Sequence, residues 1–278
     1  MVGKYDVKIG GLKYHLLYFK ENFLVSLKTA TEYKANLFSI LLENTIYFLI
    51  TITFGYVLFE NVVSISEFGF KEFLLLAFLI NIQNDVVGLF WYGSASSLDT
   101  LIKTGNFNSY FSKPMNPFFG FLFMKRFNPI IFTLYDLVLF IPLLIYYFDF
   151  QFFDVVLALL ILMFFTVFGI LFVQFLISFC WIFLEARKIL LYQLYFNGVQ
   201  HNVGRFPMLF FEKNPLILLP LSGFAFYYLS MWIVPLLTTG NFEIKMYEIV
   251  ILFIVSVVSI LGIIINWRIG LKKYEAFG

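Results

Sequence analysis

The chain has 278 residues, of which 61% are hydrophobic and only 13% carry a charge. Soluble domains average about 45–50% apolar and about 25% charged residues, so this composition excludes an ordinary soluble domain. The formal net charge of +2 is too small to indicate a nucleic-acid-binding protein. Apolar runs of roughly twenty residues, the length that crosses a bilayer as a helix, predict an all-α, polytopic membrane protein with six transmembrane helices, organised as one domain over residues 1–278.

The N-terminal region carries an amphipathic helix, predicted over residues 12–34. Its apolar side chains recur at spacings of three and four, which places them on one face, while Glu21, Asn22 and Lys28 lie on the opposite face. Lysines accompany this helix, so we expect it to lie in the membrane interface; a soluble helix packed on a partner is the alternative. The apolar face comprises Leu12, Leu16, Phe19, Phe23, Leu27 and Ala30.

Four apolar runs follow in chain order, and each is long enough to cross a bilayer as a helix. The fourth run is longer than a bilayer requires, so it must tilt or extend beyond the hydrocarbon. These four spans are predicted at Asn36–Phe59, Lys71–Gly93, Asn128–Phe148 and Phe153–Leu184.

The stretch after the fourth span stays hydrophobic but is interrupted by prolines, so one straight helix cannot cover it. We predict a fifth span at Ile189–Phe206, followed by an external re-entrant hairpin over residues 207–238. Broken backbone of this kind is tolerated at membrane depth only where protein or water satisfies its polar groups. A sixth span is predicted at Tyr247–Trp267, and six spans place both termini on one side of the membrane.

The distribution of lysine and arginine predicts which side that is. Most of these residues lie in the N-terminal arm, between the second and third spans, and after the fourth and sixth spans. By the positive-inside rule, both termini and the segment between the second and third spans lie in the cytoplasm. We therefore expect a multi-pass protein of the cell (plasma) membrane. Only four basic residues fall on the opposite side: Lys71, Arg205, Lys213 and Lys245.

The predicted cytoplasmic segment between the second and third spans, residues 94–118, is polar and rich in turn-forming residues. It nevertheless carries Phe107, Tyr110 and Phe111, whose spacings of three and four place them together on a helix. We expect these aromatic side chains to be exposed. Two interpretations follow: a short interfacial helix whose aromatics enter the headgroup region, or a docking helix for a cytoplasmic partner.

Four short stretches carry a family resemblance. The loop contributes Ile102, Lys103 and Gly105, then Tyr110, Phe111 and the pair Lys113-Pro114. The other three are EYKANLF at 32–38, FPMLFFEKNPLILLPLSGFAFYY at 206–228 and WRIGLKKYEAFG at 267–278. Together they resemble type-2 permeases of ABC transporters, in particular the subfamily similar to daunorubicin-resistance and fluoroquinolone-export permeases. The chain departs from that pattern with Phe107-Asn108 in place of Leu-Asp and with Glu275-Ala276-Phe277 in place of a Ser-rich element.

This resemblance implies a six-span permease that pairs with a second permease chain, identical or related, and with two nucleotide-binding subunits. Residues 94–118 would form the coupling helix, residues 12–34 the connecting helix and residues 207–238 the external re-entrant segment. An amphiphilic substrate, whether drug-like, lipid or peptide, would be exported by alternating access. The residues expected to couple to the ATPase subunit are Lys103, Gly105, Phe107, Tyr110, Phe111, Lys113 and Pro114.

The chain itself lacks the residue patterns of a catalytic or metal site. It has no G-x-x-x-x-G-K-[ST] motif, so we expect ATP and Mg²⁺ to be bound by the partner subunit, with no cofactor and no metal in this chain. The two histidines, His15 and His201, are far apart in the sequence, and Cys180 is the only cysteine. A serine nucleophile in GSAS, residues 93–96, with His201 as its base is the remaining enzymatic alternative.

Polar side chains inside the spans indicate a different kind of site. In the second span Asn81, Asn84, Asp85 and Gly88 share one helical face. Amides of this kind often form hydrogen bonds between helices, worth about 0.6 kcal/mol each. Carboxylates need a partner, a proton or a wet cavity, so we hypothesise that the acidic groups border a path for cationic or amphiphilic cargo. The predicted translocation path comprises Glu43, Asn81, Asn84, Asp85, Asp136, Gln193, Asn197 and His201.

The sequence therefore favours the membrane subunit of an ATP-driven exporter. Two alternatives remain at this point. The first is a non-transporting membrane scaffold that uses the same cytoplasmic loop to bind a partner. The second is the intramembrane hydrolase just described.

Overall fold

The computed structural model describes residues 12–61, 69–91, 94–113, 115–122, 128–183, 228–240 and 244–277. Across these residues the chain is helical and contains no β-strand. This agrees with the all-α prediction, because helices satisfy their backbone hydrogen bonds within one segment and so suit a chain of this hydrophobicity.

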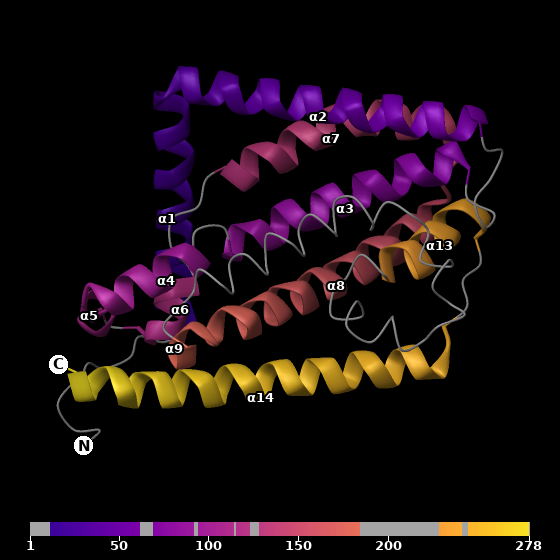
Figure 1. Cartoon of the computed structure of the whole chain (residues 1–278). Coiled ribbons are helices and arrows are strands. Elements are labelled where there is room, and N and C mark those ends of the chain that lie inside the picture. Colours follow the sequence, from indigo (N-terminus) through magenta and orange to yellow (C-terminus); the bar gives the residue numbers. More distant parts are fainter. Residues whose placement is uncertain are drawn as a thin grey trace.

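Two helices begin the described chain. Helix α1 (Leu12–Glu32) lies within the predicted amphipathic element, and Tyr33 alone separates it from α2 (Lys34–Asn61). Figure 1 shows α1 standing crosswise to α2 at one end of the molecule. The apolar face of α1 is only partly covered: Phe19 and Phe23 are half-buried, whereas Leu16 is 56% exposed.

The remaining long helices run alongside α2. They are α3 (Phe70–Trp91), α7 (Asn128–Tyr147), α8 (Phe152–Ser178) with its continuation α9 (Cys180–Phe183), and α14 (Met246–Phe277). In Figure 1, α2 and α7 run in one direction, and α3, α8 and α14 run in the other. Between α3 and α7 lie three short helices: α4 (Ser94–Lys103), α5 (Asn108–Phe111) and α6 (Pro117–Leu122).

Three helices of the described part are long and apolar enough to cross a membrane: Lys34–Asn61, Phe152–Phe183 and Met246–Tyr274. They coincide with the predicted first, fourth and sixth spans. A shorter apolar helix, Thr133–Tyr147, lies within the third predicted span, and α3 covers the second. Their outer faces carry exposed side chains such as Phe38 at 67%, Met163 at 67% and Phe253 at 69%. Apolar bands of this extent suit contact with lipid or a second membrane chain.

The described residues cover only part of the predicted topology after the fourth span. The predicted fifth span, residues 189–206, and the first part of the hairpin lie outside the described residues. The last part of the predicted hairpin is helical, formed by the π-helix η2 (Leu229–Ile233) and α13 (Val234–Thr239), and the hairpin itself stays a prediction. The sixth helix is also longer than predicted, because α14 continues past Trp267 to Phe277.

Helix α3 lies at the centre of the bundle, where it contacts α2, α7, α8, η2 and α13. Leu74, Leu75, Leu76 and Ala77, four consecutive residues that point to all sides of the helix, are each 0–1% exposed. A helix that is apolar all round is expected to be buried all round. Helices α2, α7, α8, η2 and α13 are therefore placed against α3.

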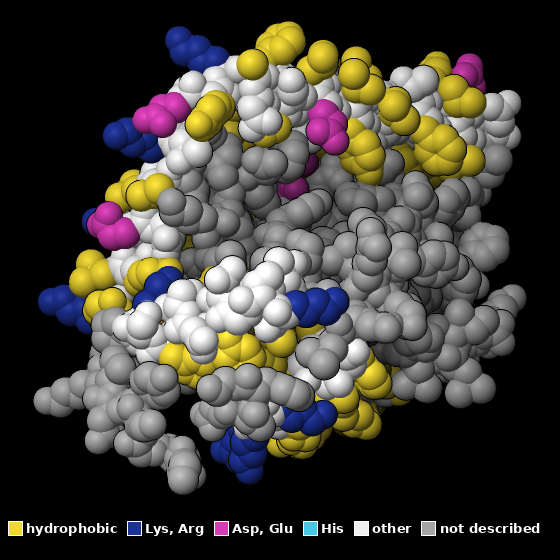
Figure 2. Space-filling view, turned by 60° about the vertical axis from the view of Figure 1, so that its left-hand side comes forward, with side chains coloured by type: hydrophobic (Ala, Val, Ile, Leu, Met, Phe, Trp, Pro, Cys, Tyr) yellow, Lys and Arg dark blue, Asp and Glu magenta, His cyan; other side chains and the backbone are white. Residues whose placement is uncertain are grey.

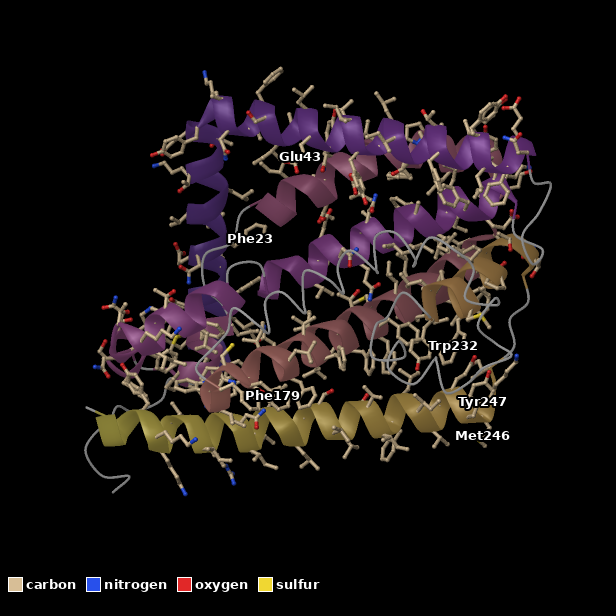
Figure 3. All side chains as sticks on the ribbon, in the orientation of Figure 1. Phe23, Glu43, Phe179, Trp232, Met246 and Tyr247 are labelled. Carbon is tan, nitrogen blue, oxygen red and sulfur yellow. The ribbon has the colours of Figure 1, made fainter. Side chains whose placement is uncertain are left out.

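The start of α14 is fixed by a buried carboxylate. Glu248, only 1% exposed, accepts a hydrogen bond from the backbone N–H of Lys245 at 3.3 Å, as in a helix capping box. The indole N–H of Trp232 in η2 donates to the same oxygen at 2.8 Å, and Figure 3 shows Trp232 near the first residues of α14, Met246 and Tyr247. This bond joins η2 to α14.

Glycines allow close approach between α14 and the helix pair α8–α9. A Cβ atom added at Gly262 would collide with the ring of Phe175, and one added at Gly270 would collide with Trp181. Small residues bring helices together in membrane proteins in this way. Between the two glycines, the side-chain amide of Asn266 donates a hydrogen bond to the hydroxyl of Ser178 at 2.8 Å.

Replacing Gly270 by leucine should destabilise the protein, because the new side chain occupies space that Trp181 fills. We expect the free energy of unfolding to fall by about 1–3 kcal/mol, measured as a lower thermal unfolding midpoint in detergent. The control is Ile269→Leu at the neighbouring position, which is 39% exposed. Equal midpoints for the two variants would contradict the close packing.

Candidate functional site

The segment formed by α4, α5 and α6, residues 94–122, is called the loop segment below. Figure 1 places it at one end of the bundle, together with α1, α9 and the C-terminal end of α14. The short helices are separated by a turn at Gly105, whose φ of 72° lies in the left-handed region that favours glycine. The backbone N–H of Phe107 then donates to the carbonyl of Leu101 at 3.1 Å, which closes the turn.

An aromatic cluster holds the loop segment in place. Phe107 is 0% exposed and Tyr110 is 4% exposed. The Phe107 ring lies 5.0 Å from Trp181 of α9, and 6.0 Å and 5.8 Å from Trp267 and Tyr274 of α14. Aromatic pairs at these separations add about 0.5–1.5 kcal/mol each beyond the area that they bury. The aromatic cluster comprises Phe107, Tyr110, Phe111, Trp181, Trp267 and Tyr274.

The burial of this cluster corrects one expectation from the sequence. Phe107 and Tyr110 were expected to be exposed, and this is wrong: both point into the protein, and Phe111 is half-buried. The reason is that α14 extends to Phe277 and provides Trp267 and Tyr274 as partners, which an isolated view of the loop does not show.

Two polar contacts tie the loop segment to its neighbours. The hydroxyl of Tyr274 donates a hydrogen bond to the carbonyl of Gly105 at 2.8 Å. The ammonium of Lys113 donates to the hydroxyl of Tyr18 in α1 at 3.0 Å, and it lies 4.8 Å from the ring centroid of Tyr110. The loop segment is thus connected to α14 on one side and to α1 on the other.

The outer face of the loop segment is polar. Apart from Phe119 in α6, which is 41% exposed, its exposed side chains are small or carry a single charge, in contrast to the buried aromatic rings beneath them. Pro114, one of the residues expected to couple to an ATPase subunit, lies outside the described residues. The exposed polar residues are Thr100, Lys103, Thr104, Asn106, Asn108, Ser109, Ser112 and Asn116.

Aromatic contacts fix the register of the three helices α2, α3 and α7. The rings of Phe78 in α3 and Phe140 in α7 lie 5.5 Å apart, and Phe48 in α2 lies 4.9 Å from the same Phe140. About one turn earlier on each helix, the hydroxyls of Thr45 and Tyr135 form a 2.8 Å hydrogen bond between α2 and α7.

This register brings several polar side chains to one level. Asp136, one turn before Phe140, faces the part of α3 that follows Phe78, because the two helices are antiparallel. Asp85 and Asp136 are close enough for their charges to interact. Asn44 precedes Thr45 on α2 and so lies at the same level. We call Asn44, Asn81, Asn84, Asp85 and Asp136 the polar cluster.

The polar cluster is buried and incompletely satisfied. Asn81 is 6% exposed and Asp136 is 7% exposed, whereas Asn84 and Asp85 are half-buried. Within the described part of the chain, four buried atoms of the cluster have no hydrogen-bond partner: Nδ2 of Asn44, Oδ1 of Asn81, Nδ2 of Asn84 and Oδ2 of Asp85. Buried polar groups are normally paired, so four unpaired buried atoms in one cluster are unusual.

The structure brings together part of the predicted translocation path. Asp85 and Asp136 join the three asparagines, while Glu43 is exposed on the side of α2 nearer α7 (Figure 3). Gln193, Asn197 and His201 lie outside the described residues, as does Gly93 of the GSAS stretch. Among the residues that the structure describes, no group of three or more His, Cys, Asp or Glu side chains could hold a metal ion.

Some residues of these sites were not identified from the sequence. Trp267 and Tyr274 lie seven positions apart and share one face of α14. That spacing alone predicts that the two rings lie together, so the sequence could have identified them as a pair. Gln83, 2% exposed, donates to the carbonyl of Phe165 at 3.4 Å and so joins α3 to α8 on the side away from the polar cluster.

Comparison with known proteins gives one match. A family model described as ABC-2 family transporter protein matches residues 44–278. The matched part contains the loop segment, all of the polar cluster and α14. No curated protein and no solved structure matches the chain.

Replacing Phe107 by alanine should release the loop segment from α9 and α14, because it removes the ring at the centre of the aromatic cluster. We expect a loss of about 3–5 kcal/mol in the free energy of unfolding, as for other buried phenylalanines. Hydrogen exchange of residues 101–113 should also become faster. Phe119→Ala is the matched control, since Phe119 is 41% exposed; similar exchange in both variants would show that Phe107 does not hold the loop.

Proposed function

Because the chain belongs to the ABC-2 family of transporter proteins, we propose that it is the permease subunit of an ATP-driven exporter that moves an amphiphilic substrate out of the cytoplasm. Members of this family are generally non-catalytic membrane subunits that work with ABC ATPase subunits. ATP and Mg²⁺ are bound by those separate subunits in this proposal, and the permease pairs with a second permease chain, identical or related.

The observation that carries the proposal is the construction of the loop segment. A polar, exposed surface lies on a backbone that the aromatic cluster fastens to α9 and α14. A loosely attached connector would move without displacing the helices, whereas a packed connector transmits a partner's movement to them. In this proposal the exposed residues Lys103, Asn106 and Ser109 contact the ATPase subunit, and Phe107 and Tyr110 pass the movement to the helices.

The distribution of basic side chains supports the proposed orientation. Figure 2 looks toward the end of the molecule that carries α1, and dark-blue basic side chains are spread across it. An excess of Lys and Arg marks the cytoplasmic side of a membrane protein. We therefore propose that this end, with both termini, lies in the cytoplasm beneath the plasma membrane. The described basic residues of the elements at this end are Lys13, Lys20, Lys28, Lys34, Lys103, Lys113, Arg268, Lys272 and Lys273.

The proposed path for substrate follows the polar side chains between α2, α3 and α7. Asp85 and Asp136 lie inside, with Glu43 at the exposed rim. Gln193, Asn197 and His201 belong to the same proposed path. Closure of the ATPase subunits would move the loop segment and reorient the helices, so that the path opens alternately to the two sides.

Crosslinking tests the proposed contact with an ATPase subunit. Cys180 is the only cysteine and is buried, so cysteines introduced by Asn106→Cys or Ser109→Cys are the accessible thiols. In membranes that also contain the ABC ATPase subunit that co-purifies with this chain, each should crosslink to that subunit. Asn61→Cys, exposed at the other end of α2, is the matched control and should not.

Measurements on the same complex also distinguish an exporter subunit from a membrane scaffold and from an intramembrane serine hydrolase. Vanadate-sensitive ATP hydrolysis should rise when the two chains are combined and should fall after Asn106→Trp, which puts a bulky side chain at the contact. A scaffold would bind the ATPase and leave hydrolysis unchanged. A serine hydrolase would instead lose its activity after Ser94→Ala or Ser96→Ala. Equal crosslinking from Asn61→Cys and Asn106→Cys would contradict the proposed surface.

A further inference from the structure

The polar cluster contains two carboxyl groups, those of Asp85 and Asp136, and no described residue of opposite charge is paired with them. The described charge that acts on Asp85 is that of Asp136, and it is of the same sign. Two carboxylates brought together away from water repel each other. Burying even one ionised carboxylate without a partner is costly. Since no described residue neutralises the two carboxyl groups, protons or a bound cation are the remaining ways to do so within the part of the chain that the structure describes.

The unpaired atoms of the cluster indicate what kind of cation fits. Oδ1 of Asn81 and Oδ2 of Asp85 are buried acceptors without a donor among the described residues. Asn81 is 6% exposed and lies one helical turn from Asp85 on the same face of α3. With a carboxyl oxygen of Asp136 they provide three acceptors. An ammonium group has three N–H donors and could give one to each.

A metal ion fits the same atoms less well. Hard cations such as Ca²⁺ take six to eight oxygen ligands. The other unpaired atoms of the cluster, Nδ2 of Asn44 and Nδ2 of Asn84, are donors and would repel a metal ion. The donor set therefore favours a cation that itself donates hydrogen bonds.

The surroundings of the cluster are apolar and aromatic on one side. Phe48, Phe78 and Phe140 form a group of rings at 4.9 Å and 5.5 Å, one turn of α7 from Asp136. Aromatic faces attract ammonium groups and cover the apolar part of a ligand. Asn84 and Asp85 are only half-buried, so the site is not sealed from its surroundings.

We propose that the polar cluster between α2, α3 and α7 binds the primary ammonium group of an amphiphile, whose apolar part packs against Phe48, Phe78 and Phe140. Asp85, Asp136 and Asn81 accept the three N–H bonds. This assigns a head group to the substrate and to that extent rests on the proposed function. Binding itself requires no ATPase subunit, so it is tested separately.

The test measures binding of hexylammonium to the purified full-length chain in an uncharged detergent at pH 7, by titration calorimetry. Hexanol and sodium chloride are the comparison ligands: hexanol has the same alkyl chain without the charge, and sodium has the charge without N–H donors. We expect saturable binding of hexylammonium at one site per chain. Hexanol and sodium should neither show this binding nor displace hexylammonium.

Variants locate the site. Asp85→Asn and Asp136→Asn should each weaken hexylammonium binding at least ~10-fold, the usual effect of removing one partner of a buried charge pair. Asp149→Asn makes the same chemical change at an exposed position between α7 and α8 and should leave binding unchanged.

Three outcomes would overturn the proposal. The wild-type chain could fail to bind hexylammonium in excess of hexanol, which would mean that protons neutralise the cluster. Sodium could compete as well as hexylammonium, which would indicate an inorganic cation. Both aspartate variants, folded by circular dichroism, could bind like wild type. None of these results depends on the crosslinking described above, so the permease function could stand while the ammonium site fails.

Discussion

The burial of α3 on every side is the constraint on which the rest of the structure depends. Leu74 to Ala77 have no exposed face, so α2, α7 and α8 must each cover part of this helix. The polar residues of α3 are covered with it. Asn81 and Asp85 share one face of α3, and Asp85 interacts with Asp136 of α7. On the opposite side, Gln83 donates a hydrogen bond to the carbonyl of Phe165. The same packing that buries α3 thus places a polar site, partly open to its surroundings, between the helices.

The two candidate sites lie against different helices. The aromatic cluster attaches the loop segment to α9 and α14, whereas the polar cluster lies between α2, α3 and α7. Helix α3 links the two sites: it packs on α7 beside the polar cluster, it packs on α8, which continues into α9, and it is followed by α4 of the loop segment. In the proposed mechanism, a movement imposed on the loop segment reaches the polar cluster through α3. This arrangement gives the proposed exporter a physical connection between the ATPase contact and the path.

The sequence predicted the long helices because each requires one continuous apolar run, which can be read without knowledge of partners. It also predicted the shared face of Asn81 and Asp85, because both lie on one helix and their spacing alone places them together. It did not predict that Phe107 is buried, because the rings that cover it belong to Trp181 and Tyr274, far away in the chain. Nor could it separate Asp136, which joins the cluster, from Glu43, which stays exposed: both lie on apolar helices, and only the register of those helices distinguishes them.

The contact between α8–α9 and α14 restricts how this molecule can change shape. Gly262 and Gly270 receive the rings of Phe175 and Trp181, and the bond from Asn266 to Ser178 lies between these two points. Sliding or rotating α14 along its neighbour would drive both rings against backbone and break a buried polar contact at once. The pair is therefore expected to move as one rigid unit. Among the described helices, α2 is the one with more freedom, because it has few buried residues and meets α7 mainly through single rings and hydroxyls.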